Sequence, residues 1–185
     1  MNNNLVKNDI VDDKSPLYAC DLLHDAKFDL DKFTYNKEQG ICHFYFEREF
    51  FEDKTLMKYE PKLFIFTKAT FPLAESELIL QNIDRIKIRD GSKIGIYTFN
   101  ECRISKNKYL MNYCEDMDIE IIFKEYPKGK FLDNNLLNKQ GTMWFFKNSF
   151  KNNKNWASKR GQVLGYKFLH CQFFGRLADR SIVQA

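Results

Sequence analysis

The amino-acid sequence predicts a mainly β protein of the β-rich α+β class, with one domain over residues 17–132. Residues 85–89 and 119–123 alternate between polar and apolar side chains, which is the period of a β-strand. Aspartate and glycine at positions 90 and 91 are a turn signal. Phenylalanine contributes 18 of the 185 residues and favours pleated, half-buried surfaces. We therefore expect an antiparallel meander that forms a sandwich or a partly open barrel.

The chain begins with a polar stretch, residues 1–16, that has no clear periodicity, so we expect a disordered leader there. From Leu17 onward the pattern changes. Apolar residues fall at the i, i+3, i+4 and i+7 positions of one helical face, namely Ala19, Leu22, Leu23 and Ala26. This spacing predicts a short N-terminal helical segment of roughly two turns.

The first strands are expected between residues 28 and 66. Phe28 and Leu30 alternate, and the phase then slips near residue 31, which is how a β-bulge looks in a sequence. Residues 36–40 predict a turn, and residues 41–50 predict the returning strand. Residues 63–66, bracketed by prolines, predict another strand.

The centre of the sheet is expected between residues 74 and 123. The turn at residues 90–92 predicts a hairpin that pairs residues 85–89 with residues 94–99. Apolar side chains occupy both faces of the second strand, so we expect it to be covered on both sides. Residues 109–114 and 117–123 predict the next pair. The predicted core consists of Phe44, Phe46, Leu63, Ile65, Leu78, Leu80, Ile86, Ile88, Ile94, Ile96, Ile119, Ile121 and Phe123.

Residues 133–185 form a basic, aromatic C-terminal segment that is expected either to add strands or to be disordered. Pro127 and Gly129 indicate a loop or linker before it. From Lys139 onward nine lysines and arginines stand against one aspartate, a net charge of +8, while the other residues carry 20 basic and 24 acidic side chains, a net charge of −4. Such a segment either packs on the acidic body or binds an external polyanion. Translation of AT-rich DNA outside its proper frame gives a similar composition, so a segment without an evolved fold is a further alternative.

Several classes of protein are disfavoured by composition. The five cysteines are odd in number and scattered, which fits reduced thiols better than a disulfide framework, and no Cys-x-x-Cys pair predicts a zinc site. The N-terminal residues lack the apolar core of a signal peptide, and no later stretch reaches the length of a membrane span. We therefore expect a cytoplasmic protein with no transmembrane segment, no metal and no cofactor.

The candidate catalytic residues are few. His24 and Asp25 place an imidazole beside a carboxylate just before the first strand, and this pairing suggests acid/base chemistry. Cys20, four residues before His24, would share its helical face and permit a thiol–imidazole or metal pair. Glu101 and Cys102 follow the central strand, where polar residues converge on pockets. Capping and turn roles are the competing interpretation, which we prefer, because no phosphate-binding loop, Gly-x-Ser-x-Gly elbow or His-Glu-x-x-His helix is present.

The C-terminal segment carries the one feature that implies a specific class of partner. Cations hold phosphates and aromatic rings stack on bases, so interleaved residues of both kinds predict single-stranded nucleic-acid binding. Solvated lysines and core aromatics are the alternative explanation of the same pattern. The candidate residues are Trp144, Lys147, Lys151, Lys154, Trp156, Lys159 and Arg160.

The tetrapeptide Leu-His-Asp-Ala at residues 23–26, followed by a bulged hairpin and a meander, resembles the opening of small uncharacterised bacterial β-rich domains and, loosely, of immunity-type domains. The resemblance implies a binding module. The leading hypothesis is therefore a non-enzymatic protein-binding or structural module with a protein partner of unknown identity. The alternatives are single-stranded nucleic-acid binding through the C-terminal segment and, third, a small enzyme that uses His24 and Asp25.

Overall fold

The computed structural model describes residues 5–11, 15–62 and 66–146. The chain divides into two compact units, the first made of residues 1–58 and 70–142 and the second of residues 59–69 and 143–185. The elements in chain order are β1 (Lys7–Ile10), α1 (Ser15–Leu23), β2 (Lys27–Asp29), the 3-10 turn η1 (Leu30–Lys32), β3 (Thr34–Asn36), β4 (Ile41–Glu49), the 3-10 turn η2 (Lys54–Leu56), β5 (Lys58–Lys62), β6 (Phe66–Asp90), β7 (Ile96–Ser105), β8 (Lys108–Tyr113) and β9 (Met117–Phe146).

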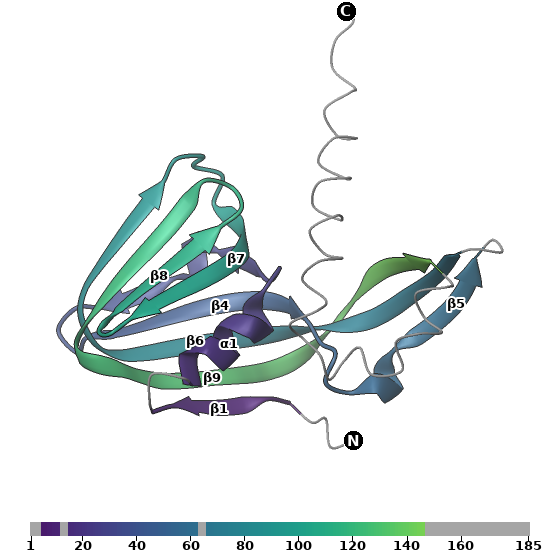
Figure 1. Ribbon diagram of the computed structural model, residues 1–185, viewed down its shortest axis with the longest axis horizontal. Coiled ribbons are helices and arrows are strands. Elements are labelled where there is room, and N and C mark those ends of the chain that lie inside the picture. The colour runs from purple at the N-terminus through teal and green to yellow at the C-terminus, as the bar shows by residue number, and fades with distance from the viewer. Residues whose placement is uncertain (1–4, 12–14, 63–65, 147–185) are drawn as a thin grey trace, which may run out of the picture. The chain divides into compact units, whose positions relative to one another are not determined.

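The first unit is a closed antiparallel barrel of six strands (Figure 1). The strand order around the ring is β9, β8, β7, β2, β4 and β6, and the ring closes because β6 also pairs with β9. Strand β1 adds to β9 outside the ring, and β3 adds to β4. The mainly β class and the barrel predicted from the sequence are confirmed.

Strand β4 shows why this sequence forms a barrel wall. Its residues alternate strictly between buried and partly exposed positions from Ile41 to Glu49, as expected for a strand with one face in a core. Phe44 lies opposite Leu78 of β6, and Phe46 lies opposite Ser76. The even-numbered positions therefore fill the barrel, whereas the odd-numbered positions form its outer surface.

The closure of the ring depends on a glycine. A Cβ atom at Gly129 of β9 would lie 2.0 Å from the carbonyl oxygen of Ile79 in β6, which is closer than any side chain allows. The backbones of β6 and β9 therefore approach each other where β9 carries no side chain. Gly129 was expected to mark a loop or linker, but it lies within β9 and serves close approach instead.

Helix α1 packs on the barrel with the predicted face. Ala19, Leu22 and Leu23 of α1 are buried, and α1 contacts β1, β4 and β7. The helix ends at Leu23, so Ala26, the fourth position of the predicted helical face, is buried between the helix and β2 instead. The turn predicted at residues 36–40 is also present, and Gly40 adopts a φ of +63° there. The bulge predicted near residue 31 is instead the 3-10 turn η1, in which the Asp29 carboxylate accepts a hydrogen bond from the Asp31 amide.

The predicted hairpin at residues 90–92 is wrong. Strands β6 and β7 are not neighbours in the sheet, because β7 pairs with β2 and β8 while the Gly91 amide donates to the carbonyl of Asp116. The chain leaves β6 at Asp90 and enters the barrel again at β7. Around the ring, β2 and β4 separate these two strands on one side, and β8 and β9 separate them on the other. A turn signal fixes a reversal of the chain, but it does not decide which strands pair.

The predicted core is correct for its three phenylalanines, for the two leucines of β6 and for its two isoleucines of β9. Buried residues of the predicted set are Phe44, Phe46, Leu78, Leu80, Ile119, Ile121 and Phe123, and Ile86 packs partly buried against them. Ile88, Ile94 and Ile96 are exposed by 39%, 56% and 58%, so their assignment to the core is wrong. A closed barrel buries one face of each strand, and in β7 that face holds Tyr97 and Phe99. Leu63 and Ile65 lie outside the described residues.

Both predicted domain boundaries fall inside secondary structure. Residues 7–10, expected in a disordered leader, form β1, whose register pairs Lys7 with Leu132 and Ile10 with Gly129. Strand β9 runs through the expected boundary at Leu132 and ends at Phe146. In the second unit, β5 neighbours β6 in the sheet. The C-terminal segment thus contributes strand up to Phe146, and residues 147–185 lie outside the described residues.

Candidate functional site

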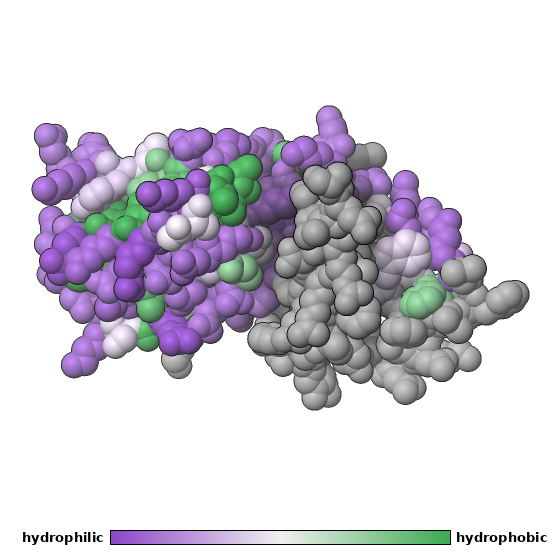
Figure 2. Space-filling model, turned by 90° about the horizontal axis from the view of Figure 1, so that it is seen from above, coloured by the Kyte–Doolittle hydropathy of each residue, from purple (hydrophilic) through white to green (hydrophobic). Residues whose placement is uncertain are grey.

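The exposed isoleucines lie around the loop that connects β6 to β7. Ile88 precedes this loop, Ile94 lies in it and Ile96 begins β7. We call these three residues the isoleucine surface. Viewed from above, hydrophobic residues gather among hydrophilic ones on the first unit (Figure 2). Exposed large apolar side chains can mark sites where another protein binds.

Hydrogen bonds hold the loop in one conformation. The Asp90 carboxylate accepts from the Lys93 amide at 2.7 Å, and Lys93 has a φ of 55°, which is in the left-handed region. The Tyr97 hydroxyl accepts from the Gly95 amide at 3.1 Å, and the Gly95 carbonyl accepts from the Leu30 amide at 2.9 Å. The backbone that carries the exposed isoleucines is therefore held by these hydrogen bonds.

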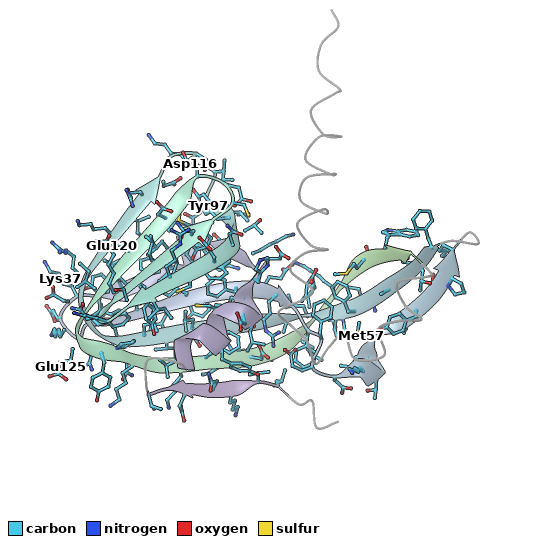
Figure 3. All side chains as sticks on the ribbon, in the orientation of Figure 1. Lys37, Met57, Tyr97, Asp116, Glu120 and Glu125 are labelled. Atoms are coloured by element: carbon cyan, nitrogen blue, oxygen red, sulfur yellow. The ribbon has the colours of Figure 1, made fainter. Side chains whose placement is uncertain are left out.

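The Asp90 carboxylate connects the loop to the barrel interior. A hydrogen bond from the Tyr97 hydroxyl is the main reason that the pKa of Asp90 lies below its ordinary value, and the Lys93 amide and charge act in the same direction against a smaller opposing effect of burial. Tyr97 and Asp116 lie near the same end of the barrel (Figure 3), where the Asp116 carbonyl accepts from the Gly91 amide at 3.0 Å. Both ends of the loop, at Gly91 and at Tyr97, are thus held by hydrogen bonds.

Paired charges lie on the outer faces of β6, β8 and β9, and one of them, Arg89, directly follows Ile88. Arg89 lies 3.3 Å from Asp118, and the Lys108 ammonium lies 2.6 Å from Glu120. The hydrogen bond from Lys108 is the main reason that the pKa of Glu120 is lowered. Charges that already have partners near an apolar surface favour an apolar ligand over a highly charged one.

The side chains of His24 and Asp25 lie close together. The His24 Nδ1 and Asp25 Oδ1 atoms lie 3.1 Å apart, but Nδ1 is buried and has no hydrogen bond of acceptable geometry within the described part of the chain. Asp25 has a φ of 64°, and its amide donates to the Phe99 carbonyl, which is the turn role that the sequence also allowed. Asp25 also lines a cleft of about 250 Å³ together with Lys27, Glu47, Glu49, Leu73, Gln140 and Gly141, whereas His24 does not.

The side chains of Glu101 and Cys102 lie in different environments. Glu101 forms an exposed ion pair with Arg103 at 2.7 Å. Cys102 follows the irregularity between Phe99 and Glu101, and its side chain is partly buried against the core. The structure therefore does not bring His24, Glu101 and Cys102 together as one site.

Two residues of the basic segment can be placed. Trp144, near the end of β9, is 47% exposed. Lys139 forms an ion pair with Glu47 of β4 at 3.0 Å, so one cation of that segment does contact the acidic body. Lys147, Lys151, Lys154, Trp156, Lys159 and Arg160 lie outside the described residues.

A buried charge network was missed by the sequence analysis. The side chains of Arg48 and Asp133 are 2% and 0% exposed, and Asp133 accepts from Arg48 Nε at 3.0 Å, from Ser76 at 2.6 Å and from the Val6 amide at 3.1 Å. Burial by itself lowers the pKa of Arg48, but the hydrogen bond to Asp133 and the charge of Glu52 raise it above its ordinary value. The sign of this network in the sequence is Arg48, a charged residue at a position where the alternation of β4 predicts an inward-facing side chain. The network therefore joins β4, β6 and β9 to the chain before β1, and we interpret its role as structural.

Within the described ranges, no three histidine, cysteine or acidic side chains are arranged to hold a metal ion, and no helix is long and apolar enough to cross a membrane. No family model matches the chain, and no curated protein or solved structure gives a significant match. The resemblance of residues 23–26 to bacterial binding domains therefore stays a prediction.

Proposed function

We propose that this protein is a non-enzymatic binding module that docks the apolar surface of another protein on its isoleucine surface. The observation that carries the proposal is the exposure of Ile88, Ile94 and Ile96 on a loop fixed by hydrogen bonds. Burial of such side chains in an interface is favourable by about 25 cal/mol per Å² of apolar area. A fixed loop loses little conformational entropy on binding, so more of that free energy appears as affinity.

The surrounding chemistry supports a protein partner over a small substrate. His24 and Asp25 lack hydrogen-bond geometry, and the cleft beside Asp25 is lined by charged and amide side chains without His24. Arg89, which directly follows Ile88, is paired with Asp118. An apolar centre with a polar rim is the usual anatomy of a protein–protein interface.

The test compares the wild-type chain with the double variant Ile94→Ser/Ile96→Ser as bait in an affinity capture from cell lysate. Tyr126→Ser is the matched control, because Tyr126 is 48% exposed on β9 and lies outside the isoleucine surface. We expect a protein that is retained by the wild type and by the control but lost with the double variant. With that protein purified, each single serine variant should weaken binding by about 1–2 kcal/mol, which is roughly 5- to 30-fold.

The proposal is wrong if the double variant retains the same proteins with unchanged affinity. A dimer of the wild-type chain that is absent from the double variant would also contradict it, because the surface would then serve a second copy of this chain. Light scattering over a range of concentrations distinguishes these outcomes before the capture experiment is interpreted.

A further inference from the structure

Two cysteines meet where helix α1 packs on the barrel. Cys20 lies on α1, and Cys102 lies on β7 just after the irregularity between Phe99 and Glu101. Both side chains line the same small cavity, of about 10 Å³, together with Ile10, Ala19, Leu78, Tyr109 and Met111. The neighbouring Cys102 thiol is also the largest cause of the raised pKa of Cys20, which places the two thiols close to each other.

A buried phenol lies in the same region. The hydroxyl of Tyr113 on β8 is buried without a hydrogen-bond partner among the described residues, and its neighbours include Cys20, Cys42 and Cys102. Burial is the main reason that the pKa of Tyr113 is raised, so the phenol stays neutral. Among the described residues, the lining of the cavity at Cys20 and Cys102 contains no carboxylate or cation.

We propose that Cys20 and Cys102 are a peroxide-sensitive dithiol that oxidises to a disulfide and ties helix α1 to strand β7. A disulfide needs sulfur atoms about 2.05 Å apart on Cβ atoms about 3.8 Å apart. Both thiols border the same cavity, which gives the side chains room to turn toward each other. This inference is independent of the proposed protein-binding function.

The chemistry assigns different roles to the two thiols. The hydrogen bond with Cys102 is the largest cause that raises the pKa of Cys20, followed by burial, so Cys20 keeps its proton. Both thiols are partly exposed, and the attack on the peroxide is assigned to Cys102. Its sulfur takes one oxygen and becomes a sulfenic acid, while the O–O bond breaks and the departing hydroxide takes a proton to form water.

The second step forms the disulfide. The sulfur of Cys20 attacks the sulfur of Cys102 and loses its proton, and the hydroxyl group of the sulfenic acid leaves as a second water molecule. In total two thiols and one hydrogen peroxide give one disulfide and two waters. The two sulfurs lose two electrons, which the peroxide gains.

The test treats the full, reduced chain with an equimolar amount of hydrogen peroxide, blocks the remaining thiols and maps cross-linked peptides by mass spectrometry. We expect a Cys20–Cys102 peptide and a melting temperature raised by about 5–10 °C, because the cross-link restricts the unfolded chain. Both effects should be reversed by a dithiol reductant. Cys114→Ser should behave as the wild type, because Cys114 is exposed and lies outside the cavity lining, whereas Cys20→Ser and Cys102→Ser should show neither effect.

Cross-links at other cysteines, or oxidation of Cys102 to sulfinic acid without a cross-link, would overturn the proposal. The wild-type peptide map decides the matter by itself, so a serine variant that fails to fold does not prevent a decision. Alanine variants at both positions distinguish loss of the thiol from effects of the serine hydroxyl in an apolar cavity.

Discussion

The Asp133→Asn substitution tests whether the buried charge network stabilises the barrel. Asp133 on β9 joins Arg48 of β4, Ser76 of β6 and the backbone of Val6, so a single carboxylate connects three strands and the N-terminal chain. Asparagine has nearly the same shape but no charge, and its amide nitrogen would face the donors of Arg48 or Ser76. The substitution therefore leaves a guanidinium that is 2% exposed without its main counter-ion.

The expected loss can be estimated from the geometry. Removal of one partner from a buried ion pair costs about 3–5 kcal/mol, because the other charge remains buried. Glu52 still lies 3.2 Å from Arg48, and this second carboxylate places the expected value near about 3 kcal/mol. The total free energy of unfolding of a domain is roughly 5–15 kcal/mol, so the loss is a large fraction of the stability.

The measurement is equilibrium unfolding in urea, followed by tryptophan fluorescence and by circular dichroism. We expect a lower transition midpoint with an unchanged slope, because the surface exposed on unfolding stays the same. Glu101→Gln is the control, since it removes an ion pair in which both side chains are largely exposed, and such pairs contribute about 0–1 kcal/mol. A loss below about 1 kcal/mol for Asp133→Asn, or equal losses for both variants, would refute the reasoning.

Three further predictions concern closure, pH and the C-terminal segment. Gly129→Ala should destabilise the barrel by roughly 1–3 kcal/mol in the same urea assay, because a Cβ atom there meets the Ile79 carbonyl at 2.0 Å; an unchanged midpoint would contradict this. The pKa of Glu120 is lowered in the folded state from its ordinary value of 4.5, so its contribution to stability is present above that pH and is lost as the pH falls through the lower folded value. The melting temperature of Glu120→Gln should therefore depend less on pH below 4.5 than that of the wild type, and parallel curves would count against it. If the C-terminal segment binds single-stranded nucleic acid, Trp144→Ala should weaken binding by about 1–3 kcal/mol in fluorescence titrations, with affinity falling steeply as salt rises; no binding at low salt would exclude the candidate.

Local patterns predicted local structure well. The i, i+3, i+4 and i+7 spacing identified the buried face of α1, and the alternation in residues 41–50 identified Phe44 and Phe46 as core. The pairing of strands was beyond such patterns, because closure joins β6 to β9 through a contact between Ile79 and Gly129, fifty residues apart. Ile94 and Ile96 were assigned to the core for the same reason, since the outer face of a strand is identified only when its neighbours are known.

The prediction of functional sites from the sequence is limited in a similar way. Adjacent residues such as His24 and Asp25 look like a site in a sequence, yet neighbours along a chain rarely point the same way, and here the hydrogen bond is absent. The pair Cys20 and Cys102 gave no signal, because eighty-two positions separate them and only the packing of α1 on β7 brings their thiols together. Arg48 and Asp133 were hidden in the same way.

The pairing of β1 with β9 sets the order of events during synthesis on the ribosome. Strand β1 leaves the ribosome first, but its partner residues 129–132 and the Asp133 carboxylate are among the last parts of the barrel to be made. At about 5–20 residues per second, the N-terminal strand waits on the order of 10 s for its partner. During that interval Arg48 has no Asp133 to bind and the barrel cannot close. A nascent chain that ends before residue 133 would therefore present unpaired strand edges to chaperones and proteases.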